Sequence, residues 1–142
     1  MELVLDASAT LAWLVNRVDK AESQLADEVL RHIQKQAAIV PAVWFPEVAN
    51  GVLMAERRGG VGSAKSAAFM GLVNSLPIEE DAIRPSAVQA TVLLLARAYD
   101  LAGYDATYLE LVLRTGRVLA TFDGHLADAV RKAGGQVFGD PV

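Results

Sequence analysis

The sequence predicts an α/β fold with three layers, α/β/α, around a short and mostly parallel central sheet of four to five strands. Short apolar runs that suit buried strands alternate with longer segments whose apolar residues recur at helical spacing. Strands that alternate with helices form parallel sheets, because each helix returns the chain to the edge where the next strand begins. The 142 residues contain no linker, internal repeat or low-complexity tract. We therefore expect residues 1–142 to form a single domain.

The strands are predicted from short apolar runs that end at a polar or turn-forming residue. Leu3-Val4-Leu5 runs into Asp6, and Ala38-Ile39-Val40 is closed by Pro41, which cannot donate a hydrogen bond to a neighbouring strand. The predicted strands are residues 2–5, 38–40, 77–79, 117–121 and 136–138.

The helices are predicted from apolar periodicity and from residues that favour helix ends. In the second helix, Leu25 and Val29 belong to an apolar face at helical spacing. Pro46 and Pro85 suit the first turn of a helix, where a missing N–H costs no hydrogen bond. The predicted helices are residues 7–15, 19 or 20 to 36, 46–58, 63–75, 85–99, 105–115 and 123–133, and Gly134-Gly135 ends the last one.

A glycine-rich segment between two of these helices is close to a phosphate-binding loop. It reads Gly59-Gly60-Val61-Gly62-Ser63-Ala64-Lys65-Ser66. The motif requires glycine where Ala64 stands, and it requires a preceding strand, whereas this segment follows a predicted helix. We interpret the segment as a turn between two helices.

The composition excludes several classes of functional site. Cysteine is absent and there are two histidines, so disulfides, thiolate zinc sites, iron–sulfur clusters and histidine-rich zinc sites are not expected. The lack of cysteine fits a reducing cytoplasm, which is the expected location. The apolar start at residues 3–5 is too short for a signal peptide, and the longest apolar runs are too short to span a bilayer. No membrane association is expected.

The charge and the hydropathy bear on possible partners. A net charge of −4 argues mildly against a generic nucleic-acid binder, because phosphate contacts need positive charge. A metal site or local basic residues would supply that charge. The hydrophobic content of 53% and the mean hydropathy of +0.29 are high for a small domain and predict an apolar patch covered by a second chain. The candidates for phosphate contacts are Arg57, Arg58, Arg114 and Arg117.

Four carboxylates stand where predicted strands end or predicted helices begin. Asp6 follows the first strand, Glu47 follows Pro46, and Asp105 and Asp123 each open a helix. The carboxyl ends of parallel strands form one rim of an open sheet, and ligands bind at that rim. Four acids gathered there are costly unless a cation balances them, and a set of oxygen ligands suits Mg²⁺ or Mn²⁺. The pattern therefore indicates metal-dependent phosphodiester chemistry.

Each acid also has an ordinary structural interpretation. Asp6, Asp105 and Asp123 could each cap the helix that follows, and Glu47 could make a favourable contact with a helix dipole. Helix capping and dipole contacts explain any one of these acids more easily than they explain the occurrence of all four at one rim. Asp128, five residues after Asp123, is a candidate outer metal contact, although a surface position fits it better.

Three residues near the acids in the sequence have side chains that could face the site or the core. Thr121 and Asp123 lie two residues apart at the end of a strand, so their side chains share one side. Tyr108 and Leu109 fit the core better than they fit a ligand contact.

The acids lie within four segments whose order and spacing form a pattern. The segments are Val4-Leu5-Asp6-Ala7-Ser8, Pro46-Glu47-Val48-Ala49-Asn50-Gly51-Val52-Leu53, Tyr104-Asp105-Ala106-Thr107-Tyr108-Leu109-Glu110-Leu111 and Leu119-Ala120-Thr121-Phe122-Asp123-Gly124-His125-Leu126. Together they resemble the PIN domain and, more narrowly, the VapC-type toxins of bacterial and archaeal toxin–antitoxin pairs. No single motif is specific, but the resemblance covers essentially the whole chain. The acidic positions of the family match Asp6, Glu47, Asp105 and Asp123, its helper hydroxyls match Ser8 and Thr121, and Asn50 matches a frequent partner of the glutamate.

The resemblance implies a PIN-like fold and a Mg²⁺- or Mn²⁺-dependent endoribonuclease that hydrolyses RNA. Glu47 would ligate the metal or orient the attacking water, and Ser8 and Thr121 would fix the carboxylates by hydrogen bonds. For a toxin of this type it also implies a homodimer and a cognate VapB-type antitoxin. The implied metal ligands are Asp6, Asp105, Asp123 and Glu47. Either a dimer surface or ordinary core packing would account for the apolar residues Met54, Phe69, Met70 and Val73.

Two rival functions stay open at this point. Asp6-Ala7-Ser8-Ala9-Thr10 is similar to the nucleophile motif of the haloacid-dehalogenase phosphatases, but that motif has a second acid where Ser8 stands. The other rival is a PIN-like module that binds or assembles without catalysis, and the presence of all four acids argues against it.

Overall fold

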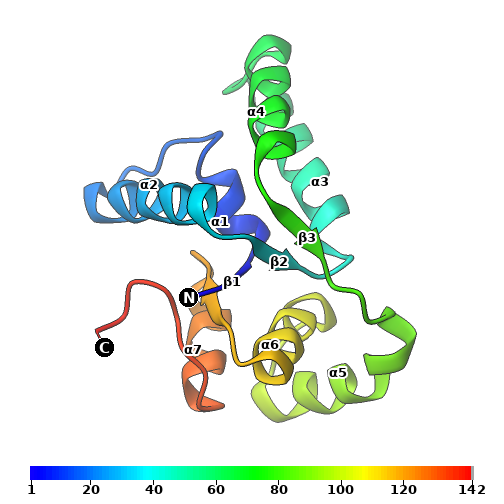
Figure 1. Ribbon diagram of the computed structural model, residues 1–142. Helices are drawn as coiled ribbons and strands as arrows, with labels where there is room; N and C mark the ends of the chain where they lie inside the picture. Colours follow the sequence, from blue (N-terminus) through cyan, green and yellow to red (C-terminus); the bar gives the residue numbers. More distant parts are fainter. Residues whose placement is uncertain (142) are drawn as a thin grey trace.

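The computed structural model describes residues 1–141 and places a four-stranded sheet between two groups of helices (Figure 1). The strand order is β3-β2-β1-β4, and every neighbouring pair is parallel. The sheet therefore has all four carboxyl ends at one rim. The strands are β1 (Leu3–Leu5), β2 (Ala38–Val40), β3 (Ile78–Glu80) and β4 (Val118–Ala120).

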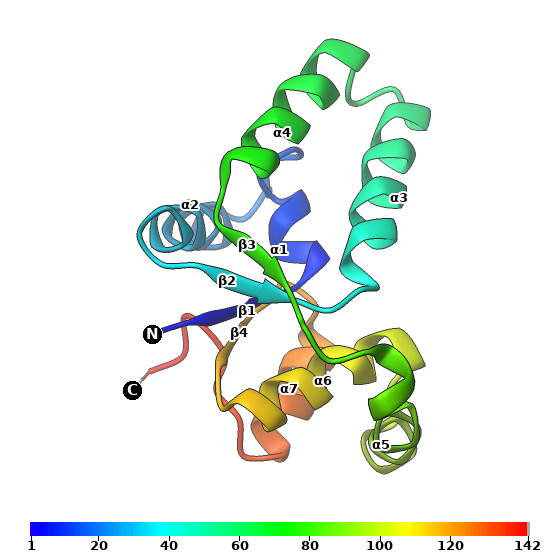
Figure 2. The ribbon, with the colours of Figure 1, turned by 45° about the vertical axis from the view of Figure 1, so that its right-hand side comes forward.

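The helices form the two outer layers of the predicted α/β/α arrangement. Figure 2 shows α1 to α4 on one side of the sheet and α5 to α7 on the other. Helices α3 and α4 extend away from the sheet as a pair. The helices are α1 (Ala7–Leu11), α2 (Lys20–Lys35), α3 (Trp44–Arg57), α4 (Ser63–Ser75), α5 (Pro85–Tyr99), α6 (Gly103–Thr115) and α7 (Gly124–Lys132).

Most predicted elements form, and α4 and α5 have the predicted bounds. Three helices differ by two residues or more at one end. Helix α3 begins at Trp44, two residues before its predicted start at Pro46. Helix α1 ends at Leu11 instead of continuing to Val15, because the chain tightens there: Trp13 N donates to the carbonyl of Thr10 and Leu14 N to that of Leu11. Helix α6 begins at Gly103, so Gly103 and Tyr104 are its first residues and not a loop before it.

The fifth predicted strand, residues 136–138, does not form. Val137 makes a single bridge to Leu119, and the pairing extends no further in the part of the chain that the structure describes. Gly134 and Gly139 flank this segment with φ angles of 89° and 97°, which turn the chain and leave little room for an extended run. The sheet thus has four strands, at the lower end of the predicted range.

The core lies between the sheet and the two helix layers. All three residues of β1 and of β4 are buried, as are the inward faces of α6 and α7. Phe69 and Val73 of α4 are 4% and 5% exposed and belong to this core, whereas Met70 is 36% exposed. Core packing, the second of the two interpretations, therefore accounts for Phe69 and Val73.

A close approach between α1 and α3 fixes the position of the first turn of α3. A Cβ added at Gly51 would lie 2.2 Å from Leu11 Cδ1, so the glycine lets the two helices pack closely. Trp44 Nε1 donates to Thr10 Oγ1 at 3.1 Å, and Thr10 Oγ1 donates to the carbonyl of Asp6 at 3.1 Å. These contacts tie the start of α3 to the end of β1.

The helices bear on two further features of the sequence. The glycine-rich segment joins α3 to α4 and so follows a helix, as the interpretation of a helix–helix turn requires. Within residues 1–141, no helix combines the length and the hydropathy needed to cross a membrane.

Candidate functional site

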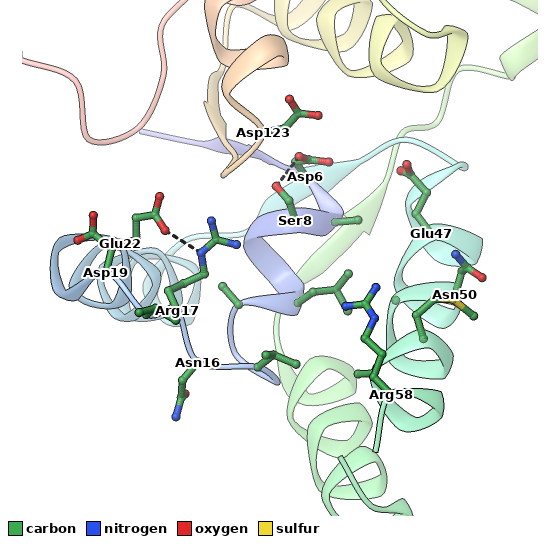
Figure 3. Close-up of a pocket in the computed structure, with 18 of the residues that line it drawn as sticks. Asp6, Ser8, Asn16, Arg17, Asp19, Glu22, Glu47, Asn50, Arg58 and Asp123 are labelled. Carbon is green, nitrogen blue, oxygen red and sulfur yellow. Dashed lines mark hydrogen bonds and ion pairs between the residues drawn. The ribbon is translucent and has the colours of Figure 1, made fainter. Parts of the chain in front are cut away.

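The four acids singled out in the sequence line one pocket of about 1020 Å³. Figure 3 shows three of them, Asp6, Glu47 and Asp123. Asp6 and Asp123 come from the ends of β1 and β4, next to each other in the sheet. Glu47 lies in the first turn of α3 and Asp105 in the first turn of α6. The parallel sheet brings these positions together because the carboxyl ends of β1 and β4, the start of α3 after β2 and the start of α6, which leads into β4, share one rim.

Asp6 does not act as a helix cap. It stands at the N-cap position of α1, but its side chain makes no capping hydrogen bond. Its Oδ2 instead accepts hydrogen bonds from Ser8 Oγ at 2.7 Å and Thr121 Oγ1 at 2.6 Å. Burial raises the pKa of Asp6, the two hydroxyl hydrogen bonds lower it, and the charge of Asp123 raises it again. Asp6 is thus a buried, oriented carboxylate with Oδ1 left for a ligand.

Ser8 and Thr121 also organise the segment that follows β4. Phe122 N donates to Ser8 Oγ at 2.9 Å, and Asp123 N donates to Thr121 Oγ1 at 3.0 Å. Each hydroxyl therefore accepts from this segment while it donates to Asp6. The network fixes the backbone of Asp123 relative to the Asp6 carboxylate.

Glu47 is held by a residue that the sequence did not reveal as part of the site. The hydroxyl of Tyr108, a residue with 0% exposure, donates to Glu47 Oε1 at 2.7 Å. Burial raises the pKa of Glu47, the hydrogen bond from Tyr108 lowers it, and the charges of Asp6 and Asp105 raise it. Tyr108 does belong to the core, as expected, and its hydroxyl contacts Glu47, which lines the pocket. Its position three residues after Asp105 on the same helix was the available signal.

The capping interpretation is wrong for Asp105 and right for Asp123. The N-cap of α6 is Ala102, and Asp105 lies inside the first turn. Burial raises the pKa of Asp105, the charges of Asp123 and Asp6 raise it further, and His125 lowers it. Asp123 caps α7, because its Oδ1 accepts hydrogen bonds from His125 N at 3.0 Å and Leu126 N at 3.1 Å.

The charges of these acids are not balanced within the described part of the chain. No Lys or Arg of residues 1–141 forms an ion pair with Asp6, Glu47, Asp105 or Asp123. Three of them have raised pKa values, and in each case another acid of the group contributes. A divalent cation would relieve this repulsion, and the set of carboxylate oxygens has the chemistry that Mg²⁺ and Mn²⁺ prefer.

The spacing of the acids is wider than that of a finished metal site. Among residues 1–141, no three His, Cys, Asp or Glu side chains lie close enough together to enclose a metal ion. The donor chemistry therefore fits a divalent cation, while the carboxylates would have to move toward it. Shared lining of one pocket is what the structure establishes.

The other candidates divide between the pocket and the rest of the surface. Asn50 and Arg58 line the pocket, from α3 and the residue after it (Figure 3). Asp128 lies on the surface and pairs with Arg131 at 2.9 Å, so it is not placed at the acids. Arg114 pairs with Asp81 and Glu110, and Arg117 pairs with Glu2, away from the pocket.

Arg17 was missed from the sequence. It lies on the loop between α1 and α2 and lines the acid pocket. No motif or periodic pattern surrounds it, so the sequence offered no signal for its position.

Comparisons with known proteins support the fold. No protein-family model and no curated protein sequence matches the chain. The crystal structure of PAE2754 from Pyrobaculum aerophilum matches with a TM-score of 0.67 and 25% identity, over 91% of this chain and 79% of that chain. The crystal structure of FitAcB from Neisseria gonorrhoeae matches with a TM-score of 0.63 and 16% identity, over 98% of this chain and 97% of that chain. These likenesses and the parallel sheet confirm the predicted PIN-like α/β/α fold.

Proposed function

We propose that this protein is a metal-dependent endoribonuclease and the toxin of a VapBC-type toxin–antitoxin pair. The observation that carries the proposal is the convergence of Asp6, Glu47, Asp105 and Asp123 on one pocket at the sheet rim, without basic partners in residues 1–141. The resemblance of the sequence to VapC toxins and the structural likeness to PAE2754 and FitAcB support the same assignment.

In this proposal Asp6, Glu47, Asp105 and Asp123 would hold Mg²⁺ or Mn²⁺. The bound metal would lower the pKa of water and stabilise the charge that develops on the phosphate oxygens. Asp6 presents Oδ1 while Ser8 and Thr121 restrain Oδ2. Glu47 presents Oε2 while Tyr108 restrains Oε1, so it can ligate the metal or accept a proton from the attacking water.

Asp105 and Asp123 complete the set. Asp123 engages Oδ1 in the cap of α7, which leaves Oδ2 for the metal without loss of the helix end. Asp105, in the first turn of α6, faces the charges of both Asp6 and Asp123. Ionisation of all the acids is therefore easiest when a cation is bound, and metal binding should release protons.

The proposed partners are RNA as substrate, a cognate VapB-type antitoxin and a second copy of this chain. Helix α5 has no buried residue, and its Leu93 and Leu94 are 51% and 64% exposed. Exposed apolar side chains of this size favour association with another protein surface. Light scattering on the purified chain, with and without a co-expressed antitoxin, tests both assemblies.

The test of activity is cleavage of labelled total RNA by the purified protein, with Mg²⁺ or Mn²⁺ against EDTA. Asp6→Asn and Asp105→Asn are compared with the wild type in the same assay. We expect fragments that need the metal and disappear in both variants. Activity that survives both substitutions would point to a contaminant or to another site and would refute this assignment.

A phosphatase mechanism would leave a different trace. In that case the Asp6 carboxylate would attack a phosphorus atom, expel the leaving group and become an aspartyl phosphate. Incubation with a labelled phosphomonoester and acid quenching would detect it. We expect no label on the protein, because Ser8 stands where that motif has its second acid.

A further inference from the structure

The acid pocket also contains a cation that the proposed chemistry does not use. Arg17 lines the pocket from the loop between α1 and α2, across α1 from Arg58 (Figure 3). A pocket lined by acids repels a polyanion, so any basic group on its wall bears on substrate binding.

Arg17 is restrained by contacts on two sides. Its Nε donates to Glu22 Oε2 at 2.9 Å, and its guanidinium carbon lies 4.8 Å from the centroid of the Phe122 ring. Phe122 stands between Thr121 and Asp123, so this stacking ties Arg17 to the segment that carries two site residues. An arginine that is both paired and stacked presents its planar fork in a defined orientation.

The two contacts leave most of the hydrogen-bonding capacity of the guanidinium free. Within residues 1–141, the ion pair to Glu22 uses Nε, and neither Nη1 nor Nη2 donates a hydrogen bond. Two terminal nitrogens that carry four N–H groups can bind two oxygens of one phosphate.

Arg17 has no other evident task. Among the described residues, it forms no ion pair with Asp6, Glu47, Asp105 or Asp123, and Glu22 is the acid with which it pairs. Its ion pair with Glu22 is exposed, with side-chain exposures of 35% and 41%, and exposed pairs contribute little to stability.

We propose that Arg17 is a positioning residue that binds a backbone phosphate of single-stranded RNA beside the scissile phosphate, and that Glu22 and Phe122 hold it in place. The inference rests on the proposed ribonuclease function. A neighbouring phosphate bound in this way would fix the strand along the pocket and would bring the scissile phosphate to the carboxylates.

The test compares Arg17→Ala, Arg17→Lys and Arg31→Ala with the wild type. Arg31 is exposed on α2 and does not line the pocket. Arg31→Ala removes the same charge as Arg17→Ala, so it is the matched control. Binding is measured by fluorescence anisotropy of a labelled mixed-sequence single-stranded RNA with Ca²⁺ in place of Mg²⁺. Cleavage of the same RNA with Mn²⁺ gives KM and kcat at several salt concentrations.

We expect Arg17→Ala to weaken RNA binding and raise KM about tenfold, with kcat changed less than about threefold. Arg17→Lys should recover part of this loss, because it keeps the charge but not the planar fork. The dependence of log Kd on log salt should become shallower by about 0.7 in Arg17→Ala, as for one lost phosphate contact on a single strand. Arg31→Ala should match the wild type.

The outcomes separate this inference from the function on which it rests. If the wild type cleaves RNA and Arg17→Ala binds and cleaves like Arg31→Ala, Arg17 has no positioning role and the ribonuclease assignment stands. If Arg17→Ala lowers kcat and leaves KM and the salt dependence unchanged, the inference is also wrong. If the wild type neither binds nor cleaves RNA, both proposals fail.

Discussion

Two buried carboxylates of this chain are equally hidden from solvent but have opposite surroundings. Asp6 and Glu110 are each 5% exposed. Glu110 pairs with Arg114, which also pairs with Asp81, so positive charge lies directly against both acids. Asp6 has two hydroxyl donors and another acid, Asp123, as neighbours. Burial alone therefore does not distinguish a structural acid from a candidate functional one, whereas an unbalanced charge does.

The electrostatics of the two groups follow from these neighbours. Hydrogen bonds to Glu110 and Asp81 raise the pKa of Arg114, which stabilises its charged form. Burial raises the pKa of Asp6, so its charged form is disfavoured in the absence of a cation. Asp81 follows β3 just as Asp6 follows β1, so the two acids have equivalent positions in the sheet. Asp81 differs from Asp6 because it pairs with Arg114.

The largest effect should come from neutralising one acid of the pocket without disturbing the fold. In Asp123→Asn the amide oxygen can still cap α7, because Asn and Asp are similar caps, while the charge is lost. We expect metal-dependent cleavage to fall at least about 100-fold, or about 2.7 kcal/mol, with little change in the free energy of unfolding. Cleavage rates and urea unfolding measure the two quantities.

Asp128→Asn is the matched control for that experiment, because Asp128 lies on the same helix and at the surface. It should cleave RNA at the wild-type rate. Equal losses in Asp123→Asn and Asp128→Asn would remove Asp123 from the site.

The structural pair should respond in the opposite way. Arg114→Met leaves the buried Glu110 and the half-buried Asp81 without a cation, which should lower the free energy of unfolding by about 2 kcal/mol. This loss of stability is smaller than that for breaking a fully buried ion pair, because the Arg114 side chain is 30% exposed. Cleavage per folded molecule should be unchanged. Adding Glu110→Gln should recover part of the stability, and a stable Arg114→Met single variant would contradict this account.

Tyr108→Phe probes the hydrogen bond that restrains Glu47. Loss of this donor, 2.7 Å from Oε1, leaves the Glu47 carboxylate free to rotate. We expect kcat to fall about tenfold, which is a rise of about 1.4 kcal/mol in the activation free energy. Tyr104→Phe is the control, since Tyr104 lies on the same helix and is 67% exposed. If both variants have wild-type kcat, the contact does not contribute to catalysis.

The smallest effect should appear in the pH dependence of stability. The pKa of Asp6 is raised in the folded state, so folding binds a proton between the unfolded and the folded pKa. The contribution of Asp6 to stability therefore falls as the pH rises through the folded pKa, and Asp6→Asn does not undergo this loss. Because the bonds from Ser8 and Thr121 offset part of the burial, the effect is small.

Urea unfolding in EDTA at about pH 4 and about pH 7 tests this sign. The stability of Asp6→Asn relative to the wild type should increase from the lower to the higher pH. A relative stability that decreases over this range would contradict a raised pKa for Asp6.

The sequence predicted the elements better than it predicted the contacts between them. Pro85 at the start of α5 and the glycines before α4 are local signals, so the bounds of both helices were correct. The strand predicted at 136–138 does not form, because strand pairing depends on a partner distant in the chain and only Val137 pairs with Leu119. The end of α1 was also predicted wrongly, because no Gly or Pro in residues 12–15 marks it in the sequence.

For the site, the sequence predicted which acids share the pocket but not what holds them. A strand end is readable from apolar residues and parallel order, and this places Asp6 and Asp123 together. The hydroxyl of Tyr108 reaches Glu47 across 61 residues of sequence, and no local pattern specifies such a contact. The same holds for Arg17 over Phe122.

The most direct test of the account is a calorimetric titration of Mn²⁺ into the wild type, Asp6→Asn and Glu110→Gln at neutral pH. The wild type and Glu110→Gln should bind Mn²⁺ with the same affinity, and Asp6→Asn should bind at least about tenfold more weakly. Absence of binding to the wild type, or an affinity that Asp6→Asn leaves unchanged, would contradict the claim that the unbalanced acids form a divalent-cation site.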